Sequence, residues 1–151
     1  AKVVAVDIND DKLALAKVSG ADIVINAKDT PNSAEKIQEL TGGCHGAVVT
    51  AVSKVAFNQA VESLRACGTV VAVGLPSEYM ELSIVKTVLD GIKVVGSLVG
   101  TRKDLAEAFD FAAQGSVVPV VQKRPIEDAP EIFAEMEAGK INGRMVLDFT
   151  K

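Results

Sequence analysis

The sequence predicts an α/β protein built on a parallel, doubly wound sheet. Over residues 1–100, apolar runs typical of strands alternate with amphipathic runs typical of helices, which indicates right-handed βαβ crossovers. The apolar runs are short and rich in Val, Ile and Ala, as in strands buried on both faces of a parallel sheet. Apolar residues make up 48% of the chain and aromatic residues only 4%, so small aliphatic side chains are expected to fill the interior.

The first strand is predicted at residues 3–6, an apolar run that we expect to be buried on both faces of the sheet. The run ends in Asp7, and Asn9 follows as a good N-cap for a helix over residues 11–19. Gly20 is positioned to end that helix. Asp7 is therefore expected at the carboxyl end of a strand.

Four more strands and three more helices follow before residue 100. The strands are predicted at residues 22–26, 46–51, 69–74 and 93–99, and the helices at residues 32–40, 54–66 and 83–90. The helix over residues 54–66 has the clearest pattern, because its apolar residues follow the i, i+3, i+4, i+7 rule: Phe57, Ala60, Val61 and Leu64. Gly68 is expected to stop it.

After Gly100 the alternation of strands and helices breaks down. Thr101 and Asp104 form a capping-box pair that opens a helix to about residue 114, with Leu105, Phe109 and Ala112 expected to face inward. An extended segment at 117–126, a helix at 127–138 and a strand at 144–149 follow. We therefore predict a first domain over residues 1–100, and we expect residues 101–151 to belong to a second domain or to pack beside the first.

Composition excludes several classes of partner. The net charge is −4 and no basic run is present, which argues against nucleic acid. No stretch approaches the roughly 20 apolar residues needed to cross a bilayer. The two cysteines lack metal-ligand spacing, and so few thiols favour a cytoplasmic location.

Because Ala1 stands almost inside a strand, we expect the natural start, with the glycine-rich phosphate-binding turn, to lie upstream.

Asp7 is the leading candidate for cofactor binding. In dinucleotide-binding folds, an acid at this place accepts hydrogen bonds from the adenosine ribose, although an ordinary acid leaving a strand would look the same. A carboxylate here would repel a 2′-phosphate, and no Arg follows in the turn, so NAD is favoured over NADP. Lys12 would reach the same ribose, unless it is simply a solvated helix lysine.

Other candidates lie where later strands end. Residues 73–75 leave the fourth strand and residues 97–100 leave the fifth, and both ends belong to the same edge of the sheet as Asp7. Simple turn chemistry is the alternative at both places. Arg144 opens the last strand and could pair with a phosphate, or be a surface arginine.

No catalytic centre is recognisable in the sequence. Cys44 and His45 are adjacent, so on a strand they would point to opposite faces and would not form a nucleophile and base. Cys67 reads as structural. The glycines at 42, 43 and 46 follow a helix rather than a strand, and are interpreted as a connection. We therefore predict no catalytic residue and no metal ligand.

Five segments in collinear order resemble the zinc-dependent medium-chain alcohol dehydrogenases, and most closely the bacterial and yeast-like, propanol-preferring group. The segments are VVAVDINDDKLALAK, GADIVIN, LRACGTVVAVGLP, VVGSLVGTRKDLAEA and MEAGKINGRMVLDF. Each is weak alone, but all five in register are specific, and the resemblance extends over essentially the whole chain. The resemblance implies the C-terminal half of an enzyme that oxidises primary alcohols to aldehydes with NAD. It also implies that residues 1–100 belong to the NAD-binding domain and residues 101–151 to the C-terminal part of the catalytic domain.

The resemblance also implies roles for individual residues. Asp7 would bind the adenosine ribose with help from Lys12, and Arg144 would contact the pyrophosphate. The nicotinamide side would be lined by Val73, Leu75, Ser97 and Val99. Zinc would polarise the alcohol oxygen so that hydride can pass to NAD.

This chain departs from the family in what it lacks. The zinc ligands, the structural zinc lobe, the glycine-rich turn and the central first strand of the family lie upstream. A gap mid-sheet is therefore expected, unless the strands rearrange or another chain fills it. We therefore expect the chain alone to be inactive, to lack zinc and to bind NAD weakly or not at all. The family pairs subunits through the fifth strand, which implies a dimer through residues 93–99 and a tetramer of the full enzyme.

Two alternatives to an alcohol dehydrogenase fragment remain. A non-enzymatic nucleotide-binding or regulatory domain would equally lack a catalytic centre. A methyltransferase also uses an acid on a cofactor ribose, but the segment VGSLVG disfavours it. The preferred alcohol is not encoded in these residues, because the substrate pocket of the family lies mostly upstream.

Overall fold

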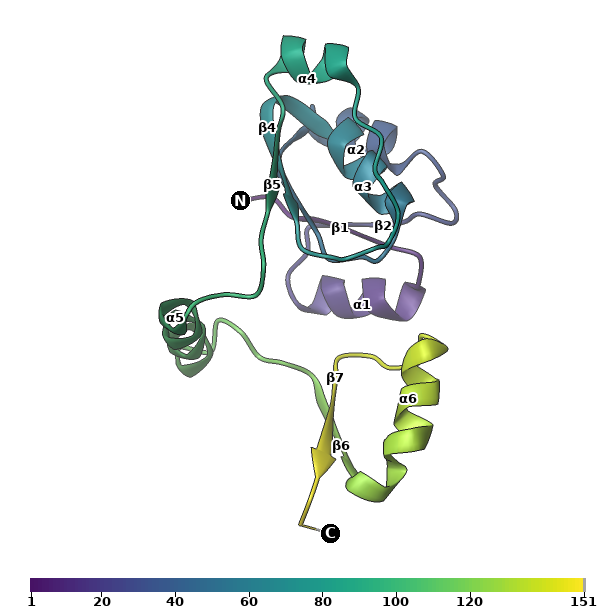
Figure 1. Cartoon of the computed structure of the whole chain (residues 1–151), viewed down its shortest axis with the longest axis vertical. Helices are drawn as coiled ribbons and strands as arrows, with labels where there is room; N and C mark the ends of the chain where they lie inside the picture. The colour runs from purple at the N-terminus through teal and green to yellow at the C-terminus, as the bar shows by residue number, and fades with distance from the viewer. Residues whose placement is uncertain (151) are drawn as a thin grey trace. The chain divides into compact units, whose positions relative to one another are not determined.

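The computed structural model describes residues 1–150, which form two compact units that divide between Gly100 and Thr101. Figure 1 shows the whole chain. The first unit contains strands β1 to β5 and helices α1 to α4, and the second contains α5, β6, α6 and β7. The division falls at the residue where the strand–helix alternation stops in the sequence. The assignment of the two ranges to a nucleotide-binding domain and a catalytic domain stays a prediction.

The chain begins with a βαβ unit. It comprises β1 (Val4–Asp7), α1 (Asp10–Val18) and β2 (Ile23–Asn26). The two strands are parallel, and their register runs from Val4 opposite Ile23 to Asp7 opposite Asn26. The predicted N-cap is confirmed, because the Asn9 side chain accepts hydrogen bonds from the backbone N–H groups of Asp11 and Lys12.

A three-stranded parallel sheet follows, in the order β3-β4-β5. Its strands are β3 (Cys44–Val49), β4 (Leu64–Ala72) and β5 (Lys93–Gly96). The helices between them and before them are α2 (Ser33–Thr41), α3 (Lys54–Glu62) and α4 (Ile84–Asp90). Asn32 and Ser83 cap α2 and α4 through their side chains, as expected for residues of these types. The glycines at 42 and 43 form the connection predicted from their place after a helix.

The two sheets reproduce a doubly wound order from which one strand is missing. In the order 3-2-1-4-5-6, β2 and β1 correspond to strands 3 and 2, and β3, β4 and β5 correspond to strands 4, 5 and 6. Within residues 1–150, no strand pairs with both β1 and β3. The described strands of the first unit therefore form two separate sheets, of two and three strands.

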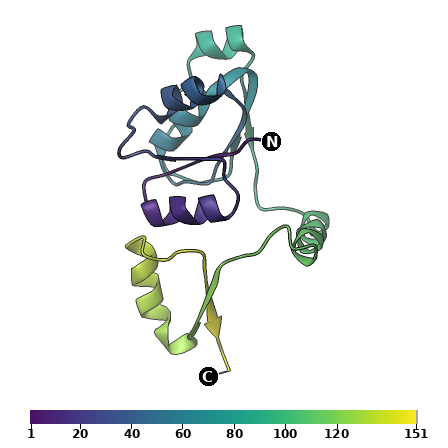
Figure 2. The ribbon, with the colours of Figure 1, turned by 180° about the vertical axis from the view of Figure 1, so that it is seen from behind.

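Helices lie on both sides of these strands. In Figures 1 and 2, α1 is on one side of the first unit, whereas α2 and α3 are on the other. Helix α1 contacts β1 and β2, and α3 contacts β3 and β4. This two-sided arrangement confirms the predicted doubly wound α/β class.

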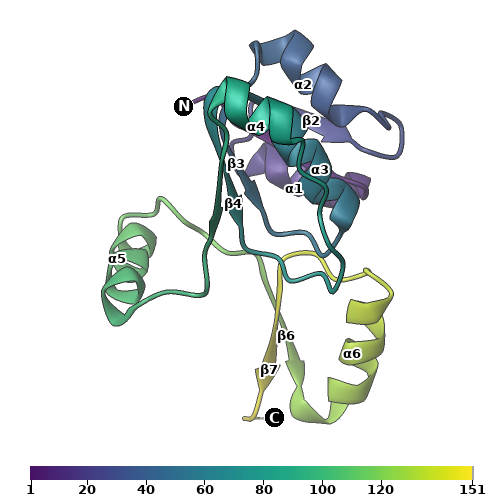
Figure 3. The same ribbon diagram turned by 45° about the horizontal axis from the view of Figure 1, so that its top comes forward.

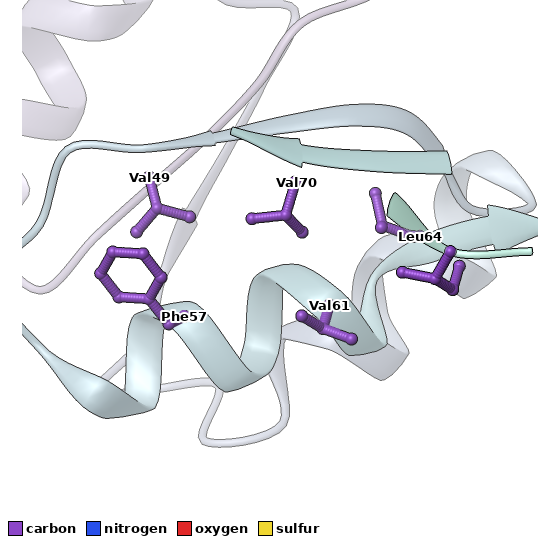
Figure 4. Packing of buried hydrophobic residues seen from close by; sticks show 6 residues of the cluster. Val49, Phe57, Val61, Leu64 and Val70 are labelled. Carbon is purple, nitrogen blue, oxygen red and sulfur yellow. The ribbon is translucent and has the colours of Figure 1, made fainter. Parts of the chain in front are cut away.

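The core of the first unit lies between α3 and the sheet β3-β4-β5. It consists of six buried apolar residues: Val49, Phe57, Val61, Leu64, Val70 and Ile92. Figure 4 shows Phe57 and Val61 of α3 beneath the side chains of the strands. The spacing that predicted α3 is thus the spacing that builds the core.

The boundary between α3 and β4 differs from the prediction. Helix α3 ends at Glu62 instead of residue 66, and β4 already begins at Leu64, so Gly68 does not stop the helix. The register of β4 against β3 shifts just after Leu64, where Cys67 has a φ of 62°. Leu64 is still buried, at 1% exposure, so it fits the apolar pattern from a strand as well as it would from a helix.

Two strands of the first unit, β1 and β5, differ from the prediction. Val3 and Val6 are 49% and 42% exposed, so the first strand is not buried on both faces. Strand β5 is shorter than expected, since it ends at Gly96 and residues 97–99 lie outside it. Among the described residues, α1 is the helix that packs closely on β1 and β2, which leaves the other face of β1 exposed.

The second unit contains a helix and a separate βαβ motif, which Figure 3 shows from another side. Helix α5 (Arg102–Ala113) has the predicted capping box of Thr101 and Asp104. However, Leu105 and Phe109 are 58% and 67% exposed and Ala112 is also exposed, so the predicted inward face is wrong. No other element of the second unit covers this helix closely enough to bury them.

The βαβ motif pairs β6 (Val121–Pro125) in parallel with β7 (Arg144–Asp148). They are joined through the 3-10 turn η1 (Ile126–Asp128) and α6 (Ala129–Glu137). Arg124 of β6 holds this connection, because its guanidinium bonds to Asp128, Glu131 and Glu135 at 2.6–3.0 Å. Across residues 1–150, no helix is both long and apolar enough to cross a membrane.

Candidate cofactor site

The strands of each sheet end level with one another. Asp7 lies opposite Asn26, and Ala72 of β4 lies opposite both Val49 of β3 and Gly96 of β5. Residues that follow these positions therefore share the carboxyl edge of their sheet. Ligands of open α/β sheets bind outside this edge, so it is the place to examine for a cofactor site.

The Asp7 carboxylate is held by the turn that follows β1. Its Oδ1 accepts hydrogen bonds from the backbone N–H of Ile8 at 2.7 Å and of Asn9 at 2.9 Å. Among the described residues, no group donates to its Oδ2. The side chain is half-buried, so one oxygen fixes the orientation of the carboxylate and the other stays available to a hydroxyl donor.

Lys12 lies in the first turn of α1 and is exposed. Its backbone N–H is bound to the Asn9 side chain at 3.4 Å, so the same cap orders the backbone that carries Lys12 and the turn that holds Asp7. A flexible lysine at this position can extend toward an anion or a hydroxyl near the turn.

The end of β4 is tied closely to the end of β3. The backbone N–H groups of Val73 and Gly74 both donate to the Val49 carbonyl, at 3.0 and 2.8 Å. A Cβ atom on Gly74 would lie 2.3 Å from the Ala51 carbonyl oxygen, so only glycine fits there. Leu75 is 80% exposed, which leaves an apolar side chain free beyond this edge.

Ser97 and Val99 lie in the loop that leaves β5. The Ser97 N–H donates to the Ala72 carbonyl at 2.9 Å, which keeps Ser97 beside the end of β4. Val99 is 94% exposed and has a φ of 38°, an uncommon conformation for a β-branched residue. Val73 and Ser97 therefore share one sheet edge, as predicted.

Arg144 belongs to the second unit, where it is the first residue of β7. Its backbone N–H donates to the Val120 carbonyl at 2.8 Å, and its side chain is exposed. The guanidinium is thus free to bind an anion, but the structure describes it within its own unit only.

Two polar residues at the edge of β1 and β2 were not anticipated from the sequence. Asn26, the last residue of β2, donates from Nδ2 to Oδ1 of Asp10 at 2.7 Å. A signal was present, because Asn26 ends the run DIVIN as Asp7 ends the run VVAVD. The contact to Asp10 joins residues on two elements and could be found only in three dimensions.

The polar residues at the amino end of β3 do not form a nucleophilic site. Cys44 is half-buried, while Nε2 of His45 lies 2.8 Å from Nη1 of Arg65, so the imidazole is engaged by an arginine. Within the part of the chain that the structure describes, no three His, Cys, Asp or Glu side chains are grouped as metal ligands.

Comparison with protein families shows which family this chain belongs to. Residues 1–114 match the family described as zinc-binding dehydrogenase, which is well over half of the chain. The chain belongs to the zinc-binding dehydrogenase family. The resemblance stated from the sequence is thereby confirmed at the level of the family.

Solved structures of alcohol dehydrogenases resemble this zinc-binding dehydrogenase chain in fold. The enzyme from the archaeon Aeropyrum pernix superposes with a TM-score of 0.89 at 29% identity, over 97% of this chain and 42% of that one. An NAD-dependent alcohol dehydrogenase gives 0.86 at 27% identity, over 98% and 44%. A zinc-binding domain protein from Burkholderia ambifaria gives 0.84 at 26%, over 92% and 40%. The chain thus spans less than half the length of these structures.

Proposed function

We propose that this chain is the C-terminal half, including the nucleotide-binding domain, of an alcohol dehydrogenase that oxidises primary alcohols to aldehydes, in the propanol-preferring group. The family match and the likeness to alcohol dehydrogenases support the proposal, and favour it over a non-enzymatic regulatory domain. The observation that carries it is the Asp7 carboxylate, with one oxygen fixed by two backbone N–H groups at the carboxyl end of β1.

The proposed cofactor is NAD, which accepts the hydride in the reaction. The free oxygen of Asp7 would accept a hydrogen bond from an adenosine ribose hydroxyl, with Lys12 reaching the same sugar. Arg144 would pair with the pyrophosphate. The nicotinamide side would lie along the ends of β4 and β5, lined by Val73, Leu75, Ser97 and Val99.

Zinc is proposed for the complete enzyme, where it would polarise the alcohol oxygen. The described residues do not fit that ion, because no suitable group of ligands occurs among them. We therefore assign no metal ligand and no catalytic residue to this chain, and the role proposed for its residues is to bind and orient NAD.

A homo-oligomer is also proposed, a dimer through residues 93–99 and a tetramer of the complete enzyme. Strand β5 ends the sheet order β3-β4-β5, and Val94 and Val95 on it are 41% and 47% exposed. An apolar edge strand of this kind favours pairing across a two-fold axis. The small number of cysteines, both free, supports a cytoplasmic location.

The test substitutes Asp7→Asn in the complete polypeptide and measures NAD binding by calorimetry. We expect NAD to bind about tenfold or more weakly, because a charge-assisted hydrogen bond to the ribose is lost. Glu39→Gln is the matched control, since it removes one carboxylate from the last turn of α2, where Glu39 pairs only with Lys36. Equal NAD affinity in the Asp7 variant and in the wild type would overturn the assignment.

A further inference from the structure

Asn26 stands directly beside Asp7. The two residues are register partners at the ends of the parallel strands β1 and β2, and neighbouring strands lie about 4.8 Å apart. Whatever Asn26 binds is therefore held close to the sugar site proposed for Asp7.

The Asn26 amide is fixed at both ends. Its Oδ1 accepts from the Lys28 backbone N–H at 2.9 Å, and its Nδ2 donates to Oδ1 of Asp10 at 2.7 Å. Since the backbone N–H can only donate, the amide orientation is set and the NH2 group must face Asp10. Asn26 thus holds the Asp10 carboxylate on the β2 side of the turn that carries Asp7.

The negative charge of Asp10 opposes the attraction that the N-terminus of α1 would exert on a phosphate. The N-terminus of α1 carries a partial positive charge that would attract a phosphate. Asp10 and Asp11, in the first turn, oppose this charge, whereas Lys12 directly after them carries a positive charge. Of the two acids, Asp10 is the one that the Asn26 amide holds beside the strand edge.

We propose that Asp10, positioned by Asn26, is a second determinant of cofactor choice that rejects the 2′-phosphate of NADP. This inference rests on the proposed NAD site. A 2′-phosphate on the ribose at Asp7 would lie at the strand edge where Asn26, the register partner of Asp7, holds the Asp10 carboxylate. Like charges closer than the Debye length of about 8 Å at physiological salt repel each other with only partial screening. Asp7 and Asp10 then discriminate against NADP together.

The experiment measures dissociation constants for NAD and NADP on the complete polypeptide, by calorimetry at 50 mM and 500 mM salt. The variant is Asp10→Asn, and its matched control is Asp11→Asn, which removes the same charge from the same helical turn without touching Asn26. We expect Asp10→Asn to tighten NADP binding by roughly three- to tenfold at low salt, with NAD affinity unchanged. The gain should shrink at 500 mM salt.

A positioning role for Asn26 is tested in the same assay. Asn26→Ala should also improve NADP binding, but by less, and should add nothing in the Asp10→Asn background, because the two residues act through one contact. An additive effect would contradict that role. Circular dichroism checks that each variant is folded.

The outcomes separate this inference from the proposed function. Wild-type protein that binds neither NAD nor NADP would overturn the proposed function itself. Wild-type protein that binds NAD, with an NADP-to-NAD ratio unchanged in Asp10→Asn or changed equally in Asp11→Asn, would overturn the inference alone.

Discussion

Gly74 offers a sharp test of how the ends of β3 and β4 are joined. Its N–H and that of Val73 both bind the Val49 carbonyl, and its α-carbon packs against the backbone of the loop after β3. The substitution Gly74→Ala adds one methyl group. That group would lie 2.3 Å from the Ala51 carbonyl oxygen and 3.0 Å from the Thr50 carbonyl oxygen.

The size of the effect follows from this overlap. An ordinary contact begins near 3.4 Å, so the two backbones must separate by about 1 Å, and neither is a flexible side chain. Overpacking of this kind costs about 1–3 kcal/mol of the free energy of unfolding. Whole domains are stable by only about 5–15 kcal/mol, so the loss is readily measured.

The assay is urea unfolding of the chain followed by far-UV circular dichroism. With a slope of about 1–3 kcal/mol per molar urea, we expect the midpoint to fall by about 1 M. Gly96→Ala is the matched control, because it adds the same methyl at the end of β5 with no atom within 4 Å. If Gly74→Ala were as stable as Gly96→Ala, the described junction of β3 and β4 would be wrong.

Two further predictions concern the core and a helix cap. Phe57→Ala should lower the free energy of unfolding by about 3–5 kcal/mol, because it leaves a cavity between α3 and the sheet. Val55→Ala is the control on the same helix, at a position 62% exposed, and should change the free energy of unfolding by less than about 0.5 kcal/mol in the same urea assay. The Thr101 backbone N–H and then its hydroxyl lower the pKa of Asp104, so Thr101→Ala should raise that pKa part of the way back in an NMR titration. Since the pKa of Asp104 is lower in the folded state than in the unfolded state, the capping box stabilises the fold at pH values above the unfolded pKa. This stabilisation is lost as the pH falls through the folded pKa. An Asp104 pKa that Thr101→Ala leaves unchanged would contradict the capping box.

Local signals were predicted well from the sequence. The caps at Asn9 and Thr101 were recognisable because a capping side chain bonds to backbone N–H groups two or three residues away. The parallel α/β fold class was also predictable, because each strand and helix is recognised from the pattern of its own few residues and their alternation indicates parallel strands.

The spacing of apolar residues gave a wrong end for α3, because this spacing indicates which residues are buried and not whether they are in a helix or a strand. Leu64 continues the apolar spacing of Phe57 and Val61, and it does reach the same core, but it does so from β4. The exposed faces of β1 and α5 show a related limit. Apolar residues such as Val6 and Phe109 reveal that a surface is suited to burial, but not whether the described part of the chain supplies the element that covers it.

The candidate site was predicted in part. Asp7 could be singled out because it ends a recognisable strand, and the ends of β4 and β5 followed from the parallel topology. The Asn26–Asp10 contact could not be found in this way, since it depends on the register of β1 with β2 and on the path of α1 between them.

The separation of the two sheets bears on the cooperativity of the first unit. No ladder of hydrogen bonds crosses from β1 to β3 within the described residues, so helix α2 and its ends carry the connection. Gln38 donates from α2 to the carbonyls of Glu62 and Leu64, and Gln59 donates from α3 to the carbonyl of Pro31 just before α2. Loss of the hydrogen bonds made by these two glutamines would weaken the link between the β1–β2 half and the half built on β3, β4 and β5, so that the two halves open less cooperatively.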